Sequence, residues 1–276
     1  MLLLASIAAC GDNIEPPASV MFVADRTANR IVRFDGVTGD WLGELAAIDR
    51  PSSVRLGPER MLYVAGFGDS AIVRIDARTG APSGMFFQDT EILEEPVELV
   101  FRGAELVVLG HDTHNAIVID PSGAMVHDVG YPDMRGAHDF VFGPGDLMYV
   151  ATQYDVTLGS AIQVWDLALG AMVDRFASLD QLANATGIAT VDDALYITDY
   201  ERGQLVRFSG HAMEILADDL VHPIGLELGP DGLLYVIDDR GIHRYATDGS
   251  YVSLFAAIGE HLVGPRSATF VLVGDL

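Results

Sequence analysis

The chain of 276 residues contains no lysine, since all 16 of its basic residues are arginines. This absence excludes enzymes that form a Schiff base between a lysine amine and a carbonyl substrate. A phosphate-binding loop ending in Gly-Lys-Ser/Thr is absent as well. Neither Gly-x-Ser-x-Gly nor His-Glu-x-x-His occurs, so the serine and zinc hydrolases marked by those motifs lack their local signature here.

Positive charge is scarce in this chain. Its 40 acidic residues outnumber the basic ones and give a formal net charge of −24 at pH 7. A surface of this sign repels phosphate backbones, so we expect no nucleic-acid partner. The same charge keeps a protein soluble and can concentrate cations near it.

Cysteine occurs once, at Cys10, directly after the apolar segment MLLLASIAA. The segment Ile7-Ala8-Ala9-Cys10 resembles the lipobox of bacterial lipoproteins, whose cysteine is lipidated and becomes the mature N-terminus. We therefore predict a signal peptide over residues 1–9, a tether over residues 10–19 and a lipid anchor at Cys10. The protein would then reside in a bacterial cell envelope, in contact with the membrane only through the lipid. The alternative is an apolar N-terminus with a buried thiol.

Long apolar runs are missing from the remainder of the chain. The apolar segments after residue 20 have the length of strands, whereas a membrane-spanning helix needs roughly 20 apolar residues. The sequence predicts no transmembrane helix there.

One sequence pattern returns six times: an apolar strand, a short polar loop and a second strand that ends at a turn. Its copies are 41, 44, 42, 47 and 39 residues apart when aligned on Phe22, Tyr63, Val107, Tyr149, Tyr196 and Tyr235. A repeat of about 40 residues with about four strands is typical of β-propeller blades. We predict an all-β, six-bladed propeller over residues 20–276. The first copy lacks an inner strand and residues 265–272 have no partner after them, so we expect this C-terminal strand to complete the first blade.

The repeats resemble those of known propeller families. The segments Phe22-Val23-Ala24-Asp25 and Pro223-Ile224-Gly225-Leu226 are similar to NHL repeats, and residues 72–80 are similar to YVTN repeats. The wider resemblance is to six-bladed propellers of the SMP-30/gluconolactonase and paraoxonase type. It covers residues 20–276 and implies the fold, but it does not name a ligand.

Strand order places the start of each inner strand and the loop after each second strand on one face, here called the upper face. The tether enters on the opposite, lower face. Inner strands begin with Ser53, Glu98, Asp139, Gly187, Gly225 and Ser267, and the second strands end with Asp25, Gly66, Gly110, Thr152, Asp199 and Asp238. Neighbouring polar residues are His111, Asp112, His114, His138 and Gln153. We expect these side chains to surround the channel mouth.

The carboxylates suggest a metal site. Glu98, Asp139, Asp199 and Asp238 could supply oxygen ligands to Ca²⁺. Resemblance to gluconolactonases and paraoxonases implies a metal that polarises a lactone or ester carbonyl, with His111 or His138 as proton carrier. Serine or glycine stands here where those families have asparagine ligands.

Two other readings of the same residues stay open. The peptide-amidating lyase is a similar propeller with three histidines on zinc, which points to His111, His138 and His222, although no pair has a recognisable ligand spacing. Alternatively, an aspartate after a second strand, such as Asp25, only caps its loop through backbone hydrogen bonds.

The sequence thus predicts a monomeric binding scaffold that presents its upper face to a protein, peptide or glycan. Phe67 and Tyr154 are the aromatic residues expected at that mouth. The alternatives are a metal-dependent lactonase or esterase and a purely structural envelope protein.

Overall fold

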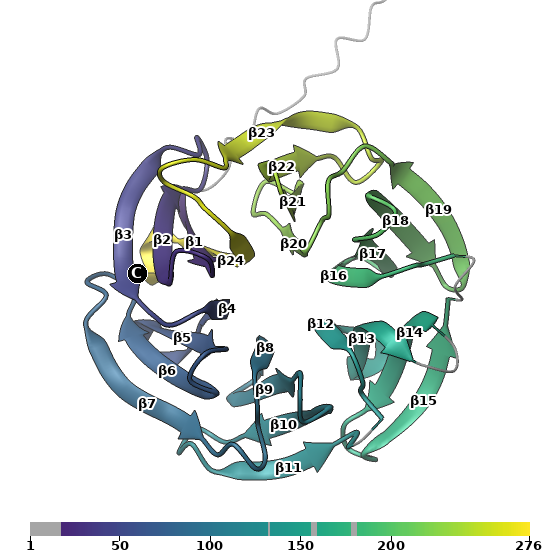
Figure 1. Cartoon of the computed structure of the whole chain (residues 1–276), viewed down its shortest axis with the longest axis horizontal. Coiled ribbons are helices and arrows are strands. Elements are labelled where there is room, and N and C mark those ends of the chain that lie inside the picture. The colour runs from purple at the N-terminus through teal and green to yellow at the C-terminus, as the bar shows by residue number, and fades with distance from the viewer. Residues whose placement is uncertain (1–17, 132, 156–158, 178–180) are drawn as a thin grey trace, which may run out of the picture.

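The computed structural model describes residues 18–131, 133–155, 159–177 and 181–276. Six four-stranded antiparallel sheets are arranged around a central channel as the blades of a propeller (Figure 1). The predicted all-β class and blade number are confirmed. Across the described ranges, no helix is long and apolar enough to span a membrane.

In blades two to six, the strands follow one another from the innermost to the outermost position. Blade two holds β4 (Pro51–Leu56), β5 (Met61–Gly66), β6 (Ala71–Asp76) and β7 (Pro82–Gln88). Blade three holds β8 (Pro96–Arg102), β9 (Glu105–Gly110), β10 (Asn115–Ile119) and β11 (Met125–Val129). Blade four holds β12 (Ala137–Gly143), β13 (Leu147–Asp155), β14 (Gly159–Asp166) and β15 (Ala171–Phe176). Blade five holds β16 (Ala185–Val191), β17 (Ala194–Asp199), β18 (Gln204–Ser209) and β19 (Ala212–Ala217). Blade six holds β20 (Gly225–Leu228), β21 (Leu234–Asp238), β22 (Gly241–Tyr245) and β23 (Tyr251–Ala257). The described residues also form the short 3₁₀ helices η1 (Pro58–Arg60), η2 (Pro144–Asp146) and η3 (Val273–Asp275).

The first blade is built from both ends of the chain. Its sheet has the order β24 (Pro265–Leu272), β1 (Ser19–Asp25), β2 (Arg30–Asp35) and β3 (Trp41–Ala47). β24 pairs antiparallel with β1 over its length, with Ser19 opposite Leu272. The predicted closure by the C-terminal strand is confirmed, and it locks the ring because neither end can leave without breaking a ladder.

The core consists of hydrophobic clusters between neighbouring blades. The second strand of each blade is buried almost throughout because blades pack against both of its faces, whereas the outer strands β7 and β11 expose most of their side chains. Tyr235 is fully buried, and its ring centroid lies 4.7 Å from Phe270 and 5.1 Å from Phe255. The repeated tyrosine position therefore serves packing between blades.

Aspartate-led turns join the outer strand pairs. The Asp76 carboxylate accepts hydrogen bonds from the backbone N–H groups of Arg78 (3.1 Å) and Thr79 (2.8 Å). Gly80 follows at a φ of +72°, and a Cβ there would lie 1.9 Å from the carbonyl oxygen of Leu45. Only glycine fits both the angle and the neighbouring blade.

The two described chain ends lie on the lower face. β1 starts there at Ser19 and reaches the upper face at Asp25. The backbone N–H of Val273 donates to the Ala18 carbonyl at 3.0 Å. The upper face is thus opposite the point where the preceding segment joins the propeller.

Candidate functional site

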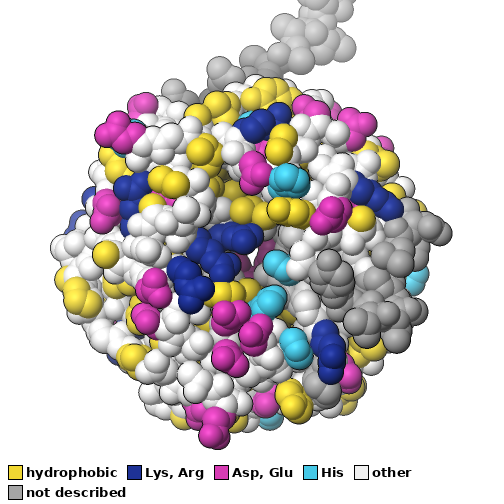
Figure 2. All heavy atoms as spheres, viewed as in Figure 1, with side chains coloured by type: hydrophobic (Ala, Val, Ile, Leu, Met, Phe, Trp, Pro, Cys, Tyr) yellow, Lys and Arg dark blue, Asp and Glu magenta, His cyan; other side chains and the backbone are white. Residues whose placement is uncertain are grey.

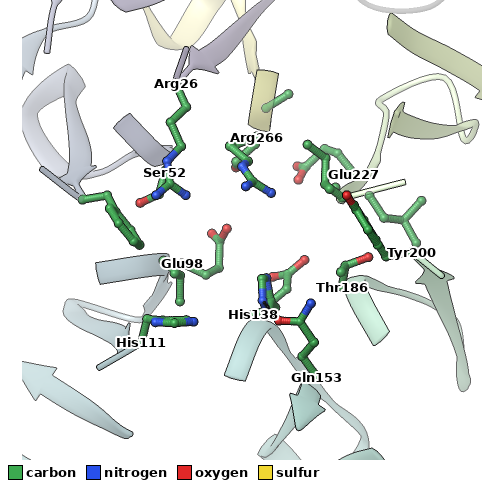
Figure 3. Close-up of a pocket in the computed structure, with 18 of the residues that line it drawn as sticks. Arg26, Ser52, Glu98, His111, His138, Gln153, Thr186, Tyr200, Glu227 and Arg266 are labelled. Atoms are coloured by element: carbon green, nitrogen blue, oxygen red, sulfur yellow. Dashed lines mark hydrogen bonds between the residues drawn. The ribbon is translucent and has the colours of Figure 1, made fainter. Parts of the chain in front are cut away.

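The upper face is hollowed at the channel mouth into a cavity of about 360 Å³ (Figure 2). All six blades line it, because the inner strands begin at this face and the loops after the second strands end there. Of the residues singled out in the sequence, Glu98, His111, His138 and Gln153 line the cavity (Figure 3). Asp139 lines it too. Phe67, Gly225 and Ser267 line it as well.

The partly buried guanidinium of Arg55 contacts several residues of the inner wall. Nη2 of Arg55, on β4, lies 3.1 Å from Oε1 of Glu98 on β8 and 3.4 Å from Oε2 of Glu227 on β20. Its Nη1 donates to the Ala268 carbonyl at 2.8 Å. The Ser53 hydroxyl donates to Glu98 at 2.6 Å. Arg55 therefore ties four inner strands together across the channel.

Asp139 joins two neighbouring blades. Its carboxylate accepts a hydrogen bond from the backbone N–H of Phe140 at 2.7 Å and from that of Ile188, on β16, at 3.0 Å. Asp139 is 9% exposed and lines the same cavity as Glu98.

Burial and neighbouring charges shift the pKa values of the ionisable side chains in this wall. Burial raises the pKa of Glu227 to about 7, and it raises the pKa of Glu98 although Arg55 and Ser53 oppose it. Burial and the nearby Glu98 charge raise the pKa of Asp139 well above its ordinary value. Burial alone would lower the pKa of Arg55, but the charges of Glu98 and Glu227 outweigh it and raise that pKa. The acids of the cavity wall thus hold protons more tightly than ordinary carboxyl groups.

Asp199 lies under a loop of blade five. Its carboxylate accepts from the backbone N–H groups of Ala183 (2.7 Å), Asn184 (3.2 Å) and Arg202 (3.2 Å). It is fully buried and does not line the cavity.

Asp238 and Asp25 act in the same way in blades six and one. Asp238 accepts from the backbone N–H of Val221 (3.0 Å) and of Arg240 (2.8 Å), and it also pairs with the Arg240 guanidinium and His243. Burial would raise the pKa of Asp238, but these hydrogen bonds outweigh it and hold that pKa well below its ordinary value. Asp25 accepts from the backbone N–H of Gly264 at 2.7 Å. All three aspartates cap loops, as the structural alternative predicts.

The four carboxylates predicted as metal ligands therefore lie in two environments. Glu98 and Asp139 face the cavity, whereas Asp199 and Asp238 are engaged by loop backbone. The donor set at the cavity does not fit a calcium site, because Arg55 already supplies the positive charge beside Glu98 and six or more oxygens are needed. A thermal melt with and without calcium tests whether the ion binds.

Two histidines face the cavity on neighbouring blades. Nδ1 of His111 lies 2.6 Å from the Asp112 carboxylate and 3.7 Å from that of Glu95. Nε2 of His138 lies 2.7 Å from Oε1 of Gln153, and burial lowers the pKa of His138 to about 4. His138 is therefore neutral at physiological pH, with Nε2–H donating to Gln153.

The other histidines of the zinc hypothesis have different partners. His222 pairs with Asp239 at 2.7 Å and stacks on Tyr200 with ring centroids 4.7 Å apart. His114 bonds through Nδ1 to the carbonyl of His111 at 2.7 Å. Within the described residues, the metal-ligating side chains that converge are Glu95, His111 and Asp112. The three histidines do not form such a group there.

Two arginines at the rim were not anticipated from the sequence. Arg26 follows Asp25 after β1, and Arg266 lies on β24, so both belong to blade one and both point into the cavity (Figure 3). The carbon of the Arg26 guanidinium lies 3.6 Å from the centroid of the Phe67 ring. Neither guanidinium has a hydrogen bond or ion pair to another residue of the described ranges.

Arg55 and Glu227 could have been predicted to face the channel from the alternation of side chains along a strand. Side chains two positions apart on a strand share a face, so the residue two positions after Ser53 or Gly225 also faces the channel. Arg55 and Glu227 occupy the second channel-facing positions of β4 and β20.

Two predictions fall outside the described part of the chain. Cys10, the proposed signal peptide and residues 10–17 of the predicted tether (10–19) lie in the segment 1–17, and the side chain of Tyr154 is not among those described. The last tether position, Ser19, is the first residue of β1. The lipid anchor stays a prediction.

No protein-family model and no curated protein matches this chain. Among solved structures it is similar to a chain of the nidogen/laminin complex, with a TM-score of 0.74 and 13% identity, covering 92% of this chain and 98% of that chain. It is also similar to hydrazine synthase from Kuenenia stuttgartiensis, with a TM-score of 0.65 and 14% identity over 89% of this chain and 80% of that chain. Streptogramin B lyase gives a TM-score of 0.62 and 14% identity over 90% of this chain and 76% of that chain. At such low identities these similarities show the propeller fold alone.

Proposed function

We propose that this protein is a binding scaffold that takes up part of a protein, peptide or glycan at the channel mouth of its upper face. The observation that carries the proposal is a cavity lined by all six blades, in which the guanidinium groups of Arg26 and Arg266 have no hydrogen bond or ion pair among the described residues. A cavity of about 360 Å³ is within the range of small-ligand sites, roughly 300–1,000 Å³.

The position of the chain ends supports a role at a surface. Residue 18 joins the propeller on the lower face, so an anchor at Cys10 would hold that face toward the membrane. The upper mouth would then face away from the membrane and be accessible to a partner. A similar fold occurs in the nidogen/laminin complex, which is an assembly of proteins.

A metal-dependent lactonase or esterase is the second candidate. It is favoured by one observation: Glu98 and Asp139 line the same cavity as His111 and His138. The ion pair of Arg55 with Glu98 opposes it. Similar propellers include enzymes named as lyases, so the fold itself is compatible with catalysis.

An array of peptides and glycans tests the binding proposal. The full chain, labelled with a fluorophore, is compared with Tyr200→Ala in the cavity wall and with Tyr251→Ala, an exposed tyrosine on the outer strand β23. We expect array ligands that are retained by the wild type and Tyr251→Ala and weakened in Tyr200→Ala. If the wild type and Tyr200→Ala bound the array equally well, or if neither bound it, the alternative of a purely structural envelope protein would be favoured.

A further inference from the structure

Two unpaired positive charges meet in a protein with an excess of negative ones. Arg26 and Arg266 are both partly buried and face the cavity, and within the described ranges neither forms an ion pair. Glu95 and Asp239 act on these two charges only from a longer distance. Of the 16 arginines in a chain of net charge −24, these two lie together at the mouth. Figure 2 shows dark blue arginine surface at one side of the central hollow. A partly dehydrated cation without a counter-ion is costly, so the arrangement suits an anion supplied from outside.

The Arg26 side chain is held in place by stacking, while its N–H groups donate no hydrogen bond within the described residues. Its guanidinium lies over the face of Phe67 at 3.6 Å, while the exposed Arg50 approaches the same ring at 5.3 Å. Stacking fixes the plane of a guanidinium and leaves the N–H groups at its edge free. Burial, together with the charges of Arg266 and Arg50, lowers the pKa of Arg26 to about 10. Burial also lowers the pKa of Arg266. A bound anion would relieve both effects.

We propose that Arg26 and Arg266 form a subsite for the carboxylate group of a ligand whose apolar body packs against the cavity wall. This inference rests on the proposed binding function and names the chemical group that the mouth recognises. Apolar contact comes from Phe67, Val97, Ile224 and Leu226, which line the same cavity.

A monoanionic carboxylate suits the site better than a phosphate. The net charge of −24 repels a dianion about twice as strongly as a monoanion, and Glu98 and Glu227 line the inner part of the cavity. A guanidinium edge also matches the two oxygens of a carboxylate. The ligand class is therefore a carboxylic acid with an apolar portion, which includes the C-terminal end of a peptide.

A ligand-observed NMR titration of the full chain at low ionic strength tests the inference with 3-phenylpropionate, its neutral amide 3-phenylpropionamide, and inorganic phosphate. We expect the acid to bind at least tenfold more tightly than the amide or phosphate, and to weaken as salt is added. Arg26→Gln and Arg266→Gln should each weaken the acid at least tenfold and leave the amide unchanged. Arg78→Gln, an exposed arginine outside the cavity, is the matched control.

The outcomes separate this inference from the function on which it rests. Equal binding of acid and amide, unaffected by either substitution, would overturn the carboxylate subsite while leaving a ligand-binding mouth intact. Tighter binding of phosphate would overturn the choice of carboxylate. No binding of any probe overturns the subsite, and the peptide and glycan array then decides the binding function independently. Melting curves of both variants verify folding, and the acid-to-amide comparison needs no variant.

Discussion

Arg55 and Glu98 form an ion pair across the wall between two neighbouring blades, with 3.1 Å between Nη2 and Oε1. The Glu98 side chain is 5% exposed, and that of Arg55 is 19% exposed. Among the described residues, Arg55 is the only arginine that pairs with Glu98 or Glu227. These contacts lie at the centre of the propeller. The position of the ion pair makes it both a link between blades and the counter-charge of the cavity wall.

Replacing Arg55 by methionine should destabilise the protein. The substitution keeps the length of the side chain and leaves the buried Glu98 and the partly buried Glu227 without a cation, which costs about 3 kcal/mol of unfolding free energy. The double variant Arg55→Met/Glu98→Gln should recover part of the loss. Urea unfolding at pH 8 measures both, with Arg78→Met as the exposed control. An Arg55→Met protein as stable as the wild type would contradict the structural role of the pair.

Calcium should not raise the melting temperature of the wild type. Arg55 already neutralises Glu98, and Asp199 and Asp238 are occupied by loop backbone, so the predicted ligands do not form one cation site. The measurement is a thermal melt of chelator-treated full chain with and without millimolar CaCl₂. A native-state ligand at a hundredfold excess over its Kd would add about 2.7 kcal/mol of stability. A rise that Glu98→Gln abolishes would instead support the metal-dependent hydrolase.

Glu227 should make stability depend on pH. Burial raises its pKa to about 7 from 4.5. Between these values the unfolded chain releases the proton while the folded protein keeps it. The stabilising contribution is therefore complete below pH 4.5 and is lost as pH rises through 7, by up to about 1.4 kcal/mol per pH unit. Glu227→Gln cannot titrate, so its free energy of unfolding relative to the wild type should increase from pH 5 to pH 8. Parallel pH profiles of the two proteins, measured by urea unfolding, would be inconsistent with a raised pKa.

Removing the cap at Asp199 should weaken blade five. Asp199→Ala takes the acceptor from three backbone N–H groups, and we expect a loss of about 2 kcal/mol of unfolding free energy or more. Asp199→Asn keeps one acceptor oxygen and should lose less. Chemical denaturation compares both with Asp193→Ala, an exposed aspartate in the preceding turn. If Asp199→Ala and Asp193→Ala were equally stable, the capping assignment would be wrong.

The fold could be predicted from the sequence because each blade has a short-range sequence pattern that repeats along the chain. The repeated apolar strands, the Asp76-to-Gly80 type of turn and the unpartnered C-terminal strand each follow from short-range pattern, and together they define six blades and their closure. The site was predicted in part, since inner-strand starts place Glu98 and Asp139 at the mouth. Which aspartates cap loops and which face the channel depends on backbone N–H groups contributed by distant loops, such as those of residues 183 and 184 around Asp199. Arg26 and Arg266 are 240 residues apart in the chain and come together only when the ring closes.

Plugging the channel mouth tests the proposed binding function most directly. In a Cys10→Ser background, Tyr200→Cys in the cavity wall and Tyr251→Cys on the outer strand are each labelled with a bulky maleimide. Binding to the peptide and glycan array is then measured before and after labelling. We predict that the label abolishes binding in Tyr200→Cys and leaves it intact in Tyr251→Cys. Array binding that survives a fully labelled Tyr200→Cys would contradict the account, because the ligand would then be held outside the channel mouth.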